Sequence, residues 1–136
     1  MAADYLLDSN HAATLVTTSH PLRKRVMDRM ASGDRFWTCV PVVTETVFGL
    51  GMLPRATENL TEWSRLEVLM PCLRPGQREA RLAGELQVTL RRRGWQLATV
   101  DALIAVVALR SDLVLLTTDK DFLAVPDLRH ENWRES

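Results

Sequence analysis

Four acidic residues in separate segments of the chain could together hold a divalent cation. They are Asp8, Glu45, Asp101 and Asp119. Carboxylates that converge in a partly buried site repel one another, and a hard cation with oxygen ligands, such as Mg²⁺, removes that conflict. Such a metal site can activate a water molecule for attack on a phosphodiester. If the four segments meet, the pattern predicts metal-dependent phosphodiester hydrolysis.

Alternating strands and helices would bring these acids together. Residue patterns predict strands at residues 5–7, 36–40 and 113–116, and helices from about residue 11 and over 21–31, 41–52, 57–69, 78–92 and 101–109. This order favours a single domain, residues 1–136, with an α/β fold: a three-layer α/β/α sandwich around a central, mostly parallel sheet. In open parallel sheets, sites lie at the carboxyl ends of the strands, where Asp8 and Asp119 are expected.

Each acid, taken alone, also has an ordinary structural explanation. Asp8 could cap the next helix, Asp101 could be a first-turn acid in a helix capped by Thr99, and residues 119–121 could form a turn. Glu45 is harder to explain in this way, because apolar neighbours predict that its helix largely contacts the core, where an unpaired carboxylate is costly. Those neighbours are Val42, Val43, Val47 and Phe48. The four acids together favour the metal site.

Composition narrows the classes of protein. Seventeen basic and seventeen acidic residues give no net charge, so nucleic-acid binding would have to use local patches. Cys39 and Cys72 have neither the spacing of a zinc site nor that of a disulfide framework. No signal peptide or long apolar segment is evident, so we expect a cytoplasmic protein without a membrane span.

Four short motifs in a fixed order resemble the PIN domain of VapC toxins. They are LDSN at residues 7–10, VTE at 43–45, LATVDALIA at 97–105 and TTDKDF at 117–122. The closing segment, residues 122–133, is also similar, so the resemblance covers essentially the whole chain. It implies a PIN-like fold, RNA cleavage dependent on Mg²⁺ or Mn²⁺, neutralisation by a small cognate antitoxin of the VapB type, and homodimerisation.

The resemblance also implies roles for particular residues. Asp8, Glu45 and Asp101 match the first three acids of the family, and the fourth is Asp119 or, as second choice, Asp121. Residues that match small polar positions, which orient ligands or bound water, are Ser9, Asn10 and Thr118. The expected mechanism is attack by a metal-activated water on RNA.

Contacts with RNA are less well defined by the sequence. Many relatives have paired arginines after the Glu45 motif, whereas here only Arg55 follows it. The run Arg91, Arg92 and Arg93 could bind phosphates, although arginines in the last turn of a helix also complement its dipole.

Other interpretations stay open. A non-catalytic PIN-like module that binds RNA or protein would be expected to lack one or more of the acids, and a structure-specific DNA nuclease would use the same metal chemistry. His11 lies beside the first motif, but no nucleophile pattern accompanies it, so we expect a structural role. The tryptophans are scattered and fit packing or a protein-binding surface better than base stacking.

Overall fold

The computed structural model describes residues 2–135, in which short strands are separated along the chain by one or more helices. The strands are β1 (Asp4–Leu7), β2 (Arg35–Cys39), β3 (Cys72–Leu73), β4 (Val114–Leu116) and β5 (His130–Glu131). The α-helices are α1 (Ser9–Ala12), α2 (Pro21–Ala31), α3 (Val40–Gly51), α4 (Ala56–Glu67), α5 (Gln77–Arg92) and α6 (Thr99–Arg110). Two 3-10 helices complete the set, η1 (Ala13–Val16) and η2 (Lys120–Ala124).

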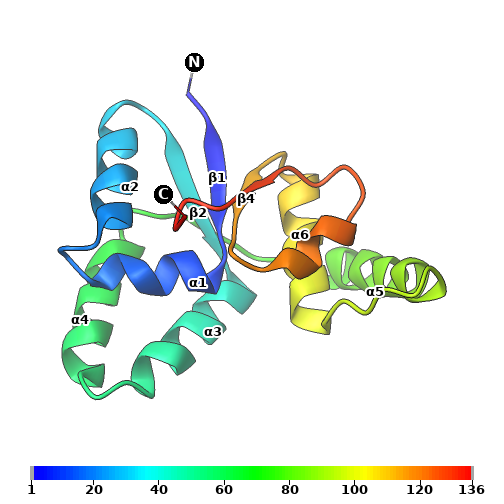
Figure 1. Ribbon diagram of the computed structural model, residues 1–136, viewed down its shortest axis with the longest axis horizontal. Coiled ribbons are helices and arrows are strands. Elements are labelled where there is room, and N and C mark those ends of the chain that lie inside the picture. The colour runs from blue at the N-terminus through cyan, green and yellow to red at the C-terminus, as the bar shows by residue number, and fades with distance from the viewer. Residues whose placement is uncertain (1, 136) are drawn as a thin grey trace.

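The strands form one parallel sheet at the centre of the fold. Within residues 2–135 it has five strands in the order β3-β2-β1-β4-β5, and every neighbouring pair is parallel. Helices α1 to α4 lie on one side of the strands and α5 and α6 on the other (Figure 1). The predicted three-layer α/β/α architecture is therefore confirmed.

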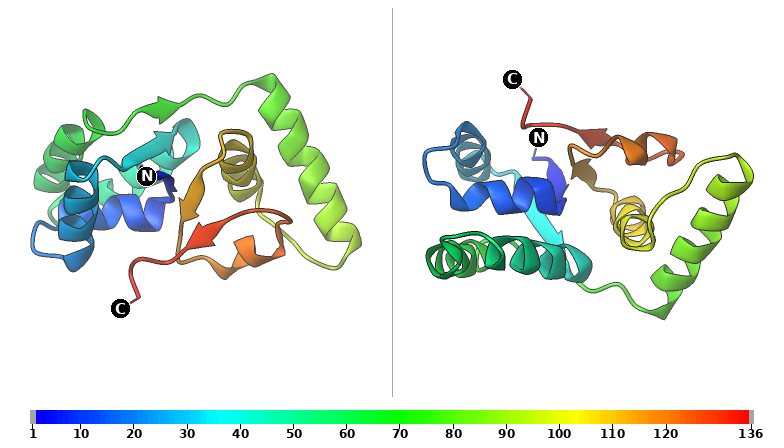
Figure 2. Two further views of the ribbon diagram at one scale, coloured as in Figure 1. Left: turned by 90° about the horizontal axis from the view of Figure 1, so that it is seen from above. Right: turned by 60° about the horizontal axis from the view of Figure 1, so that its bottom comes forward.

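The core lies on both faces of the central strands, against α6 on one side and against the helices α1 to α4 on the other. Leu6, Leu7, Leu115 and Leu116 are fully buried, as expected for strands covered on both faces. Helix α6 is apolar nearly all round because it lies between the strands and α5, which packs on its outer side (Figure 2). The buried β1 and β4 pair directly, so their carboxyl ends meet at one edge of the sheet.

Several local predictions need correction. Val40 was expected to end the second strand, but it begins α3. Thr99 does not cap α6; it is the first helical residue, Ala98 is the N-cap, and the Thr99 hydroxyl accepts a hydrogen bond from Gln87. The strands β3 and β5 were not predicted, because two residues are too few to show an alternating pattern.

Helix α3 also contacts the core less than its apolar sequence predicts. Val42, Thr46 and Leu50 form its buried face, whereas Val47 is 40% and Phe48 71% exposed. The exposed side chains continue into Met52 and Leu53 just after the helix, and we call the exposed set from residue 47 to 53 the α3 apolar face.

Candidate active site

Asp8 is placed by the end of β1 and the start of α1. Its backbone N–H donates to the carbonyl of Leu116 at the end of β4, at 2.9 Å. Its carboxylate caps α1, with Oδ1 accepting the Ser9 N–H at 2.8 Å. The helix cap predicted at Asp8 is therefore present, and the same short contacts fix Asp8 where β1 and β4 end side by side.

The other oxygen of Asp8 is held by two side chains. Oδ2 accepts the Thr117 hydroxyl at 2.7 Å and the Asn10 side-chain N–H at 3.1 Å. Asp8 is only 4% exposed, and burial is the main reason that its pKa is raised; the Thr117 and Ser9 hydrogen bonds oppose the rise, and the Asp119 charge adds to it.

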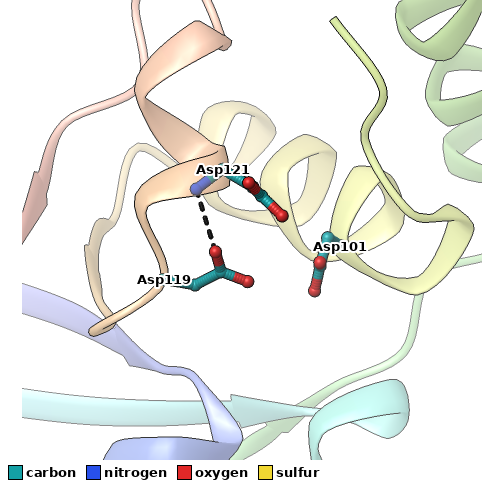
Figure 3. A group of neighbouring side chains, drawn as sticks. All are labelled: Asp101, Asp119 and Asp121. Atoms are coloured by element: carbon teal, nitrogen blue, oxygen red, sulfur yellow. Dashed lines mark hydrogen bonds between the residues drawn. The ribbon is translucent and has the colours of Figure 1, made fainter.

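Three further acids lie close together beside the ends of these strands. A carboxylate oxygen from each of Asp101, Asp119 and Asp121 falls within 4.8 Å of the other two, and the three side chains point toward a common space (Figure 3). Asp101 is in the first turn of α6, Asp119 caps η2, and Asp121 lies within η2. The Asp121 N–H donates to Asp119 Oδ1 at 2.9 Å, which couples the two acids.

Glu45 approaches the same region from α3. Its pKa is raised, first by burial and then by the charge of Asp8, while the Ser9 hydroxyl lowers it through a hydrogen bond. Asp119 adds to the rise. These influences place Glu45 within electrostatic reach of acids from β1 and β4.

Asp101 carries the largest shift among the acids. Burial and then the charges of four neighbouring carboxylates raise its pKa from 3.8 to about 7. Those neighbours are Asp8, Asp119, Glu45 and Asp121. We call the five residues the acidic cluster.

The acidic cluster fits a hard divalent cation. It offers only oxygen donors, which Mg²⁺ and Mn²⁺ accept, and it comes from four separate segments. Burial first, and the charges of neighbouring carboxylates second, raise the pKa values of Asp8, Glu45 and Asp101, and a bound cation would favour the ionised forms of all three. Asp101, Asp119 and Asp121 could bind one ion most directly, with Asp8 and Glu45 beside them.

The predicted small polar residues take different positions around this cluster. Ser9 contacts Asp8 and Glu45, and Asn10 contacts Asp8. Thr118 takes part through its backbone N–H, which donates to Asn10 Oδ1 at 3.1 Å. The hydroxyl that holds Asp8 belongs instead to Thr117, which sequence reasoning missed.

The predicted RNA-contacting arginines lie outside the acidic cluster. Arg55 precedes α4, pairs with Glu58 at 3.3 Å and lines a separate surface hollow with Thr17 and Thr57. The exposed run at residues 91–93 is at the end of α5.

Trp95 was not singled out by the sequence, yet it lies near the acidic cluster. Its indole N–H donates to the Asp121 carbonyl at 3.2 Å, so the segment between α5 and α6 contacts η2.

Comparison with known proteins gives a consistent result. The PIN domain model matches residues 5–128. A chain of the VapBC2 complex from Rickettsia felis, solved with a DNA fragment from its promoter, is 21% identical with a TM-score of 0.83, over 96% of this chain and 98% of that one. The DNA-bound VapBC of Salmonella typhimurium gives 22% identity and a TM-score of 0.80, over 98% and 99% of the two chains.

A third similar structure is VapC20 of Mycobacterium tuberculosis, described as a toxin that cleaves the sarcin-ricin loop. It is 18% identical with a TM-score of 0.67, over 90% of this chain and 95% of that one.

Among curated protein sequences, none matches significantly. Within residues 2–135, no helix has the length and apolar character to cross a membrane. The family model spans most of the sequence and agrees with the fold, so the chain belongs to the PIN-domain family.

Proposed function

We propose that this protein is an endoribonuclease dependent on Mg²⁺ or Mn²⁺, acting as the toxin of a toxin-antitoxin pair of the VapBC type. The observation that carries the proposal is the acidic cluster, in which the pKa of Asp101 is raised to about 7. A strongly shifted acid among further carboxylates is a mark of a functional site. The PIN family and the RNA-cleaving toxin among the similar structures support RNA as the substrate.

We assign metal binding to Asp8, Glu45, Asp101 and Asp119, with Asp121 as a fifth donor. A bound divalent cation supplies Lewis-acid stabilisation of the phosphoryl oxygens and lowers the pKa of water, so that hydroxide is available near neutral pH. The protein's own contribution is to position the ligands. Hydrogen-bond donors hold the Asp8 carboxylate without a metal, and the fold brings the carboxylates of Asp101, Asp119 and Asp121 close together.

The polar residues around Asp8 have supporting roles in this proposal. Ser9 connects Asp8 with Glu45, and Asn10 and Thr117 orient the second Asp8 oxygen. Thr118 orients Asn10 through its backbone. Removing such supporting contacts typically costs about 10- to 100-fold in metal affinity or activity.

We assign phosphate contacts to exposed arginines that lie outside the acidic cluster. The exposed residues Arg91, Arg92 and Arg93 precede the segment that joins α5 to the Asp101 helix, which makes them the first candidates. Arg55 is a weaker candidate because Glu58 already pairs with it. Charge-removing variants should raise the KM for RNA and reduce its salt dependence without changing the metal requirement.

A VapB-like antitoxin and a second copy of this chain are the proposed protein partners. The similar structures from Rickettsia felis and Salmonella typhimurium are VapBC complexes. The α3 apolar face, with Phe48 71% and Met52 72% exposed, provides apolar area that a partner would cover. Light scattering of the wild type and of Phe48→Asp, each with and without antitoxin, tests both associations.

The decisive experiment compares the wild type with Asp101→Asn. A structured RNA pool and a matched DNA are incubated with each protein in Mn²⁺, Mg²⁺ or chelator. Asp28→Asn is the matched control, because this exposed acid lies on α2 and, among residues 2–135, forms an ion pair only with Lys24. We expect wild type and control to cleave RNA only with metal, and Asp101→Asn to be inactive.

Each other result has a definite meaning. Cleavage at the wild-type rate by both Asp101→Asn and Asp8→Asn would indicate contamination, whereas cleavage by Asp101→Asn alone would exclude Asp101 from the metal site. Preferential cleavage of DNA would indicate a DNA nuclease. RNA binding without cleavage under every condition would favour a non-catalytic binding module.

A further inference from the structure

His11 is a fully buried histidine that the proposed chemistry does not use. Its Nε2 accepts the backbone N–H of Trp133 at 3.0 Å. Because an N–H group only donates, this ring nitrogen must carry a lone pair rather than a proton. Burial, with the nearby charges of Arg134 and Arg25, also lowers the pKa of His11 to about 4, so the ring is neutral near pH 7.

The proton of the neutral ring must therefore lie on Nδ1. Nδ1 is 2.8 Å from Oδ1 of the Asn10 side chain, so His11 donates to it. The backbone N–H of Thr118 donates to the same oxygen at 3.1 Å. Two independent donors thus identify which end of the Asn10 amide is the oxygen, and fix its orientation.

The orientation of the Asn10 amide decides whether its N–H₂ group or its carbonyl oxygen faces the Asp8 carboxylate. With Oδ1 bound by two donors, the Asn10 N–H₂ group faces Asp8 Oδ2 at 3.1 Å and Thr117 Oγ1 at 3.4 Å. A reversed amide would place a carbonyl oxygen against the Asp8 carboxylate, and would leave the donors of His11 and Thr118 without an acceptor. His11 thus helps to select the arrangement in which Asp8 is hydrogen-bonded.

The far end of this connection is firmly held. Strand β5 pairs with β4, and the Trp133 ring packs against Tyr5 and Phe36, with centroids 4.8 and 5.7 Å away. The Arg25 guanidinium lies 3.9 Å over the same ring. The backbone N–H that fixes the His11 tautomer is therefore part of a packed segment, residues 130–133, and not of a loose end.

We propose that His11 is a positioning residue for Asp8, acting through Asn10, and that it links the docked segment 130–133 to the acidic cluster. The proposal rests on the proposed function in one respect, that Asp8 binds the metal. The hydrogen-bonded link from Trp133 through His11 and Asn10 to Asp8 does not itself depend on a metal.

Two amide variants separate the ends of the imidazole. In His11→Asn the side-chain N–H₂ can replace the Nδ1 donor to Asn10, whereas in His11→Gln the carbonyl oxygen reaches further and can replace the Nε2 acceptor of Trp133. Both are neutral and close to histidine in size. If His11 only filled space, the two variants would have the same effects. The proposal predicts instead that each variant keeps the hydrogen bond that the other loses.

The first measurement uses metal-free protein and NMR. Long-range ¹H–¹⁵N spectra of the wild type should show His11 as the Nδ1–H tautomer. His11→Gln should shift the Asn10 side-chain amide signals and leave Trp133 amide exchange near the wild-type rate. His11→Asn should leave the Asn10 side-chain amide signals near their wild-type positions and speed up Trp133 amide exchange. An Nε2–H tautomer, or unshifted Asn10 signals in folded His11→Gln, would overturn the link.

The second measurement is Mn²⁺ affinity by calorimetry. We expect His11→Gln to bind Mn²⁺ about 10-fold more weakly than the wild type and His11→Asn to stay within about 3-fold, as for loss or retention of a supporting contact. Equal losses of Mn²⁺ affinity in the two variants would mean that His11 contributes only by packing. If the wild type bound no Mn²⁺, the metal-site proposal would fail, and the positioning role with it, while the metal-free spectra would still decide the hydrogen-bonded link.

Discussion

Asp8 and Asp101 belong to the same acidic cluster, but the fold treats them differently. Asp8 is 4% exposed and accepts hydrogen bonds from Ser9, Asn10 and Thr117. Asp101 is half-buried, and within residues 2–135 no hydrogen bond supports its carboxylate. Asp8 is therefore fixed in position without a ligand. Asp101 keeps its charge only at a cost that a cation would remove.

This contrast implies a division of roles around the cluster. The β1 end sets the geometry of the site, because its carboxylate is already oriented. The α6 end makes the site most sensitive to charge, because the raised pKa of Asp101 would fall when a cation binds to the acidic cluster. Substitutions of Asp8 and of Asp101 should therefore both reduce RNA cleavage, but they should differ in their effect on the free energy of unfolding.

The largest expected effect is the loss of activity at either end. Asp8→Ala and Asp101→Ala should each reduce metal-dependent RNA cleavage by more than about 100-fold, because each removes a proposed metal ligand and not only a supporting contact. Single-turnover assays in saturating Mn²⁺ provide the measurement. A variant that kept activity within a few fold would remove that residue from the metal site.

Stability should distinguish the same two variants. Asp8→Ala loses a helix cap and leaves buried donors without an acceptor, so its free energy of unfolding should fall by about 2–3 kcal/mol. Asp101→Ala removes a repelled carboxylate and should leave the unfolding free energy unchanged or raised. Urea unfolding in chelator tests this difference, and equal losses in the two variants would contradict it.

Thr117 allows a sharper test of the β1 end. Thr117→Val keeps the shape but removes the hydroxyl that donates to Asp8 and accepts from the Asp119 N–H. Mn²⁺ affinity should fall about 10-fold, measured by calorimetry. Thr117→Ser should restore it. Thr118→Val is the matched control and should have little effect, because Thr118 acts through its backbone.

The sequence located the acids better than it located their supports. Asp8 follows a buried strand and Asp101 opens an apolar helix, and both signals are local, so their positions and the α/β architecture could be predicted. The choice between Thr117 and Thr118 could not, because adjacent residues point in opposite directions and only the pairing of β4 with β1 decides which faces Asp8.

Non-local contacts and exposure account for the remaining differences. The contact between His11 and Trp133 joins residues 122 positions apart, and no spacing rule connects them. The exposed Phe48 looked like a core residue because hydrophobic character alone does not say whether a second surface covers it. An apolar face that serves a partner and one that serves the core have the same composition.

The smallest expected effect is a pH dependence of stability to which Asp101, with the largest pKa shift among the acids, contributes most. With a folded pKa of about 7 against 3.8 when unfolded, Asp101 holds its proton longer in the folded chain. The metal-free protein should therefore lose stability as pH rises from about 4 to about 7, and remain level above that. Because Asp101 is partly solvated, we expect about 1–2 kcal/mol, or roughly 3–6 °C in Tm.

Subtracting the Asp101→Asn curve isolates this contribution from that of Asp8 and Glu45, whose pKa values are also raised, and from that of acids with lowered pKa values and the opposite pH dependence. Thermal unfolding in chelator should give a wild-type Tm that declines toward neutral pH relative to the variant. Saturating Mg²⁺ should abolish the decline, since a bound cation keeps the carboxylate ionised. Parallel curves for the two proteins would mean that Asp101 is not the charged group that the cluster destabilises, and that the two ends of the site do not differ as the structure indicates.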